Sequence, residues 1–92
     1  MIVDGRALAL ERLRQVRDCL AQSADAESLT HLVDEIDHLS TSVESFHMEA
    51  IRFRLFGLRR HLAASDRPLF ARASGLLDDA SAALEAAGFK IK

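Results

Sequence analysis

Large aromatic side chains are scarce in this sequence. It contains no tryptophan and no tyrosine, and phenylalanine occurs only five times in 92 residues. β-Sheets are enriched in such side chains, so their scarcity argues against a sheet fold. Almost half of the residues are nonetheless hydrophobic, and most of these are leucine and alanine, which favour helices. The composition therefore predicts an all-α protein.

Cysteine is also scarce, and long apolar runs are missing. The single cysteine, Cys19, excludes a disulfide within the chain, and the sequence does not start with the basic and apolar regions of a secretory signal. No apolar run approaches the roughly 18 residues of a membrane span. We therefore expect a cytoplasmic protein with no membrane partner, in which Cys19 is a small buried hydrophobe rather than a nucleophile.

Basic residues are absent from a long central part of the chain. No lysine or arginine lies between Asp18 and Glu49, whereas six arginines and one acid lie between Arg52 and Arg72. Arginine clusters can contact nucleic acid, but the net charge of -2 and the neighbouring acids argue against that partner. Ion pairing within and between chains is the use that this asymmetry favours.

The two ends of the sequence each predict one helix. Apolar residues at helical spacing predict a first helix over about 5–22. A last helix is predicted to begin near Pro68, capped by Ser65 or Asp66, and to end at Gly88. Phe89 follows as the apolar residue that often accompanies such a C-terminal glycine.

The centre of the sequence predicts one long helix over about 26–64. An apolar stripe continues at spacings of three and four residues without a glycine or proline inside it: Leu29, Leu32, Ile36, Leu39, Val43, Phe46, Ala50 and Phe53. Its alternative is a break near 40–42, where Thr41 and Glu44 have the spacing of a capping box. The first reading gives a three-helix protomer and the second a four-helix bundle, both within a single domain over residues 1–92.

A second apolar stripe predicts self-association. It lies beside the first and comprises Met48, Ile51, Leu55, Leu58 and Leu62. A helix over 26–64 would be about 60 Å long, and its apolar stripes would remain exposed to solvent unless a second copy covered them. We therefore predict an antiparallel homodimer or larger helical bundle, in which acidic and arginine-rich halves face each other.

Nine residues are predicted to form the dimer interface: Phe46, Met48, Ala50, Ile51, Phe53, Arg54, Leu55, Arg59 and Arg60. Phe46 and Phe53 are assigned to the core stripe, so replacing either ring with alanine is expected to destabilise the protein by about 3 to 5 kcal/mol. Arg54 recurs at seven-residue spacing with His47 and His61, as register-setting polar groups in a coiled coil do.

Histidine and acidic residues supply the one candidate for chemistry. Glu44 and His47 form an E-x-x-H pair, the spacing that recurs in di-iron helical bundles. His31 and His38 share a helix face with acids and could hold zinc. A solvated face of i,i+4 pairs is the favoured interpretation, so no metal, cofactor or catalytic residue is assigned.

No stretch of the sequence matches a phosphate-binding loop, a paired-cysteine motif or a nucleophile elbow. The sequence therefore predicts a helical, homo-oligomeric module with a structural or protein–protein interaction role, which could include regulation, rather than an enzyme. The alternative function is an iron- or zinc-binding helical bundle.

Overall fold

Four helices account for most of the chain. The computed structural model describes residues 5–23, 27 and 29–91, and every regular element within these ranges is an α-helix. The helices are α1 (Gly5–Ala21), α2 (Thr30–Glu44), α3 (Met48–Ala63) and α4 (Pro68–Ala86). The all-α prediction is confirmed, and the count of helices matches the four-helix alternative.

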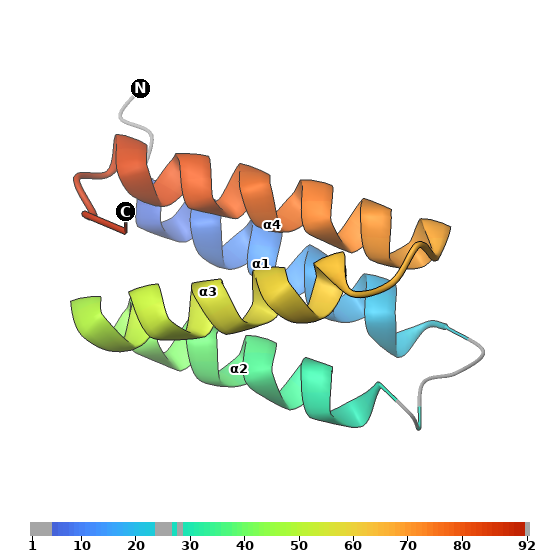
Figure 1. Cartoon of the computed structure of the whole chain (residues 1–92). Helices are drawn as coiled ribbons and strands as arrows, with labels where there is room; N and C mark the ends of the chain where they lie inside the picture. The colour runs from blue at the N-terminus through green and yellow to red at the C-terminus, as the bar shows by residue number, and fades with distance from the viewer. Residues whose placement is uncertain (1–4, 24–26, 28, 92) are drawn as a thin grey trace.

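The helices run alternately in opposite directions (Figure 1). α1 packs against α2 and α4, and α3 packs against the same two helices, so each helix has two antiparallel neighbours. One apolar core receives residues from all four helices. Its largest fully buried side chains are Leu13, Leu20, Ile36, Leu39, Ile51, Leu58, Leu77 and Leu84.

The first and last helices follow their sequence signals closely. α4 has Pro68 in its first turn, although Arg67 rather than Ser65 or Asp66 occupies the N-cap position. The Ser65 hydroxyl instead accepts a hydrogen bond of 3.2 Å from the Arg67 backbone N–H. At the other end Gly88 takes a positive φ of 95°, and the Phe89 N–H donates to the Leu84 carbonyl at 2.9 Å. This arrangement is the predicted glycine-terminated C-cap.

The predicted long helix is wrong, because the chain reverses in its middle. α2 ends at Glu44 and α3 begins at Met48, so the break lies at Ser45–His47, beyond the 40–42 segment of the alternative. Thr41 does not cap a new helix; its hydroxyl donates to the Asp37 carbonyl at 3.1 Å, inside α2. The predicted start of the long helix near residue 26 lies outside the described residues.

Phe46 makes the reversal in a backbone conformation that normally calls for glycine. Its φ is 57°, in the left-handed region that bulky residues rarely adopt. The His47 N–H donates to the Ser42 carbonyl at 2.9 Å and the Phe46 N–H to the Val43 carbonyl at 3.2 Å, which is the hydrogen-bond pattern of a Schellman motif. Because no glycine stands here, local sequence gave no stop signal.

The reversal changes which stripe of α3 is buried. Ile51, Leu55, Leu58 and Leu62 are at most 2% exposed and enter the core of their own chain. Phe46 and Phe53 are 61% and 77% exposed, so their assignment to the core is wrong. The same reversal lays acidic α2 against arginine-rich α3 within one molecule, where a long helix would have needed a second copy.

Candidate functional site

The outer face of α3 carries an exposed stripe at coiled-coil spacing. Its six members are called here the α3 stripe: Phe46 in the turn before α3, and Glu49, Phe53, Phe56, Arg60 and Ala63 on α3 itself. All six are exposed, and they follow one another at alternating spacings of three and four residues. Sequence reasoning missed Glu49, Phe56 and Ala63, although their spacing was readable once α3 was known to begin at Met48.

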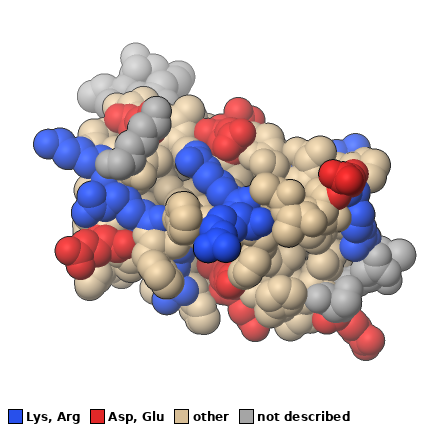
Figure 2. Space-filling view, viewed as in Figure 1, with Lys and Arg blue, Asp and Glu red and all other residues tan. Residues whose placement is uncertain are grey.

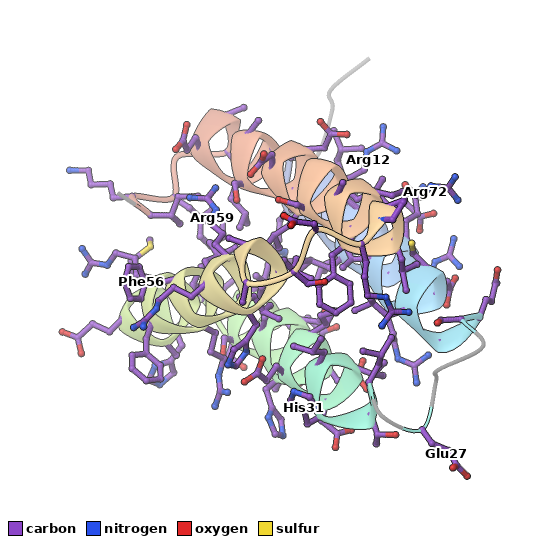
Figure 3. All side chains as sticks on the ribbon, turned by 45° about the vertical axis from the view of Figure 1, so that its right-hand side comes forward. Arg12, Glu27, His31, Phe56, Arg59 and Arg72 are labelled. Carbon is purple, nitrogen blue, oxygen red and sulfur yellow. The ribbon has the colours of Figure 1, made fainter. Side chains whose placement is uncertain are left out.

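Three of the four exposed large hydrophobic side chains of the described residues belong to the α3 stripe. Phe53 is 77% exposed and Phe56 is 63% exposed. Figure 3 shows the Phe56 ring pointing away from the other helices, and the guanidinium carbon of Arg60 lies 5.7 Å from the centre of that ring. The fourth side chain, Leu8, is 38% exposed and lies on α1. The exposed aromatic surface is thus concentrated on α3 and the turn that precedes it.

Phe46 is exposed but held in place by its own chain. Its ring stacks on Phe89, with centres 5.7 Å apart and planes 9° from parallel. The Arg6 guanidinium carbon also lies over the Phe46 ring, 4.6 Å from its centre. These contacts join the α2–α3 turn to Arg6 near the start of the chain and to Phe89 near its end, so they hold the Phe46 ring in place.

A shallow hollow lies in the middle of the α3 stripe. It has a volume of about 470 Å³, and its lining includes Phe53, Phe56, Gly57 and Arg60. A Cβ atom added at Gly57 would meet nothing within 4 Å, so the backbone there is uncovered. A glycine inside a helix lowers its stability by about 1 kcal/mol relative to alanine. No packing contact within the chain requires a glycine at position 57.

Basic side chains surround the α3 stripe. α3 contains four arginines and one glutamate, and Figure 2 shows blue side chains gathered over the middle of the face where α3 lies. Arg59 is used within the chain, because it donates a 2.9 Å hydrogen bond to the buried Ser81 hydroxyl and lies 3.7 Å from Asp78. Figure 3 shows Arg59 on the side of α3 that faces α4.

Not every predicted interface residue is on the surface. Ile51 and Leu55 lie in the core, where their own chain covers them, and Met48 packs against that core while half-buried. Ala50 and Arg54 are also half-buried. Phe46, Phe53, Arg59 and Arg60 are exposed. The predicted interface is thus reduced to those residues that the outer side of α3 presents.

Of the three polar residues predicted to set register, His61 contacts another helix of its own chain. His61 Nδ1 lies 3.0 Å from Glu35 Oε2, which links α3 to α2. Arg54 lines a small hollow of about 60 Å³ together with Glu35. The contact between His61 and Glu35 forms because the chain reverses between α2 and α3.

The candidate metal ligands are not brought together. Glu44 ends α2, His47 precedes α3, and both are exposed, as are His31 and His38 on α2. His31 instead lies beside His61, with ring centres 6.0 Å apart. Within residues 5–23, 27 and 29–91, no three histidine, cysteine or acidic side chains are grouped to hold a metal ion. The geometry does not favour the metal-binding alternative.

Cys19 lies half-buried on α1 and lines an open hollow of about 420 Å³ between α1 and α4. The ionisable side chains that share this hollow are Asp18 and Arg72. A catalytic thiol commonly has a histidine base beside it, and no histidine lines this hollow, where Asp18 offsets the positive charge of Arg72. The hollow is therefore a weaker candidate than the α3 stripe.

Among the described helices, none is both long and apolar enough to cross a membrane. Comparison of the chain with protein-family models, with curated proteins and with solved structures gave no significant match.

Proposed function

We propose that this protein is a structural or regulatory interaction module that acts by associating with further copies of itself through the outer face of α3. The observation that carries the proposal is the clustering of exposed aromatic rings on the α3 stripe. Contiguous apolar surface on a small protein commonly marks a contact site for another protein. The scarcity of disulfide-forming cysteine supports a cytoplasmic setting for this role.

The exposed rings set how much apolar area their pairing could bury. At about 200 Å² for a whole phenylalanine, Phe53 and Phe56 leave roughly 275 Å² uncovered in each copy. Covering the rings of two copies would remove up to about 550 Å² from water, which is worth about 14 kcal/mol at 25 cal/mol per Å². Association itself costs about 4 to 15 kcal/mol, which is similar in size to this upper bound, so we expect weak association with a dissociation constant in the high micromolar range.

The core of the protomer explains why the helix can offer this surface. Ile51, Leu55 and Leu58 are already covered by the same chain, so association does not have to open the bundle. Loss of the outer rings should consequently weaken association without unfolding the monomer. This separation makes the proposal testable with folded variants.

The test is the mass in solution over a wide concentration range, measured by light scattering after size exclusion. We expect the native chain to move from about its own mass of 10.2 kDa towards twice that mass as concentration rises. Phe53→Ser/Phe56→Ser should remain at the lower mass while keeping its helical circular dichroism.

The matched control is Leu8→Ser, which removes an exposed apolar side chain from α1 instead. This variant should associate as the native chain does. A native chain that stays monomeric up to millimolar concentration would refute self-association, and equal weakening by both variants would remove α3 as its site.

A further inference from the structure

We infer that two copies pair through the α3 stripe in an antiparallel arrangement, in which Glu49 of each copy faces Arg60 of the other. This inference rests on the proposed function and adds the identity, direction and register of the partner helix. Its occupant is therefore a second copy of this chain, and the observation that points to it is the order of charges and rings along the α3 stripe.

The α3 stripe is complementary to itself when two copies run in opposite directions. In an antiparallel pair related by a two-fold axis, facing residues have numbers with a constant sum. With Glu49 opposite Arg60, the same register places Phe53 opposite Phe56. Each acid then meets a base and each of the two inner rings meets a ring. The central four contacts are thus self-complementary.

Other directions and registers lose this complementarity. A parallel pair would set Glu49 against Glu49 and Arg60 against Arg60, and like charges in register oppose pairing. Moving the antiparallel register by four residues would place Glu49 opposite Ala64 and Arg60 opposite Phe53, which leaves the acid without a basic partner. Charge therefore selects one register among those that bury the rings.

The surface of the protomer fits this register. Arg60 and Glu49 are both exposed, and no ion pair to another residue of the chain is recorded for either within the described parts. The hollow beside Phe56 is open above the Gly57 backbone. In the proposed register Phe53 of the second copy lies over this hollow. Gly57 thus faces the incoming ring with no side chain of its own.

The first experiment reverses the charges singly and together. Glu49→Arg sets two arginines against each other at both ends of the dimer, and Arg60→Glu does the same with two glutamates. Because exposed pairs are weak and each change acts twice, we expect each single variant to lose about ten-fold in association constant at low salt. The combined Glu49→Arg/Arg60→Glu variant should recover most of the native value, as should a mixture of the two single variants.

The second experiment maps the facing residues with cysteines in a Cys19→Ser background. Residues 49 and 60 are about 16 Å apart along one helix, whereas a disulfide requires Cα atoms within about 7 Å, so no bond can form within a chain. Under mild oxidation, at concentrations where light scattering shows a dimer, Glu49→Cys/Arg60→Cys should form a covalent dimer efficiently. Glu49→Cys alone and Arg60→Cys alone should not.

The outcomes separate this inference from the proposed function. A native chain that never dimerises overturns both. A native dimer that Phe53→Ser/Phe56→Ser dissociates, but in which charge reversal is not rescued by the double reversal, overturns only the register. Efficient cross-linking of the single cysteine variants would likewise show that the helices pair in parallel or at random.

Discussion

The neighbouring positions Phe53 and Leu55 give the sharpest test of how α3 is oriented. Both are large and apolar, and they stand two residues apart on the same helix, yet Phe53 is 77% exposed and Leu55 is 2% exposed. Replacing each with alanine should therefore have unequal effects on folding. The comparison needs no knowledge of function.

The expected magnitudes follow from burial. Leu55→Ala removes a buried side chain and should lower the free energy of unfolding by about 2 to 5 kcal/mol. The Phe53 ring keeps about a quarter of its surface covered, roughly 45 Å², which is worth about 1 kcal/mol. Alanine regains about 0.5 kcal/mol through its higher helix propensity, so Phe53→Ala should cost about 0.5 kcal/mol.

The assay is urea unfolding followed by circular dichroism at low micromolar concentration, where the chain is expected to be monomeric. With a slope of about 1 to 1.5 kcal/mol per molar urea, a loss of 3 kcal/mol lowers the midpoint by about 2 to 3 M. The total stability of a chain this long is about 5 to 14 kcal/mol, so that shift is a large fraction of it. A loss above about 2 kcal/mol for Phe53→Ala, or below about 1 kcal/mol for Leu55→Ala, would refute the orientation of α3.

Three further predictions concern glycines and one ion pair. Gly5→Ala should destabilise the fold by about 1 to 3 kcal/mol in denaturant melts, because its Cβ would lie 2.7 Å from the Ala87 Cβ and 2.9 Å from the Ala83 carbonyl oxygen. Gly75→Ala, whose Cβ would meet nothing within 4 Å inside α4, should stabilise the fold by about 0.5 to 1 kcal/mol. A Gly75→Ala variant less stable than Gly5→Ala would contradict this packing. Gly88→Ala should cost about 1 to 2 kcal/mol because φ is 95°, and an unchanged midpoint would show that the C-cap is not maintained in solution. The hydrogen bond from Arg14 lowers the pKa of Glu11, so the small stabilisation from this carboxylate is present at neutral pH and lost as pH falls through the lowered pKa; Glu11→Gln should therefore differ from the native chain at pH 7 but not at pH 2, as followed by thermal melts.

The candidate site was only partly readable from the sequence. Phe53 and Arg60 were expected at an interface, and both are exposed, but Ile51 and Leu55 were assigned to the same surface and lie in the core. The two sets interleave on one helix, and each alone has acceptable helical spacing. Choosing between them requires knowing which side of α3 the other helices cover, which is a property of the folded chain.

Charge patterning was informative about neighbours but not about whether they belong to one molecule. The separation of acids from arginines predicted that the two segments face each other, and α2 does pack against α3. The contact that joins them is between Glu35 and His61, whereas Asp37 pairs with Arg17 of α1 and Arg59 with Asp78 of α4. A reversal within the chain and a pairing between chains satisfy the same electrostatics. The length of the connecting turn, which the sequence did not mark, separates the two cases.

The sequence by itself determined the helical class and the limits of the outer helices, because these depend on local signals. Leucine- and alanine-rich periodicity defines α1 and α4, Pro68 fits the first turn of α4, and Gly88 provides the positive φ that ends it. Tertiary structure alone decided the turn at Phe46. A phenylalanine adopts φ of 57° there only because the surrounding fold outweighs the local strain: reversal buries Ile51, Leu55, Leu58 and Leu62, and the Phe46 ring stacks on Phe89, which is more than 40 residues away in sequence.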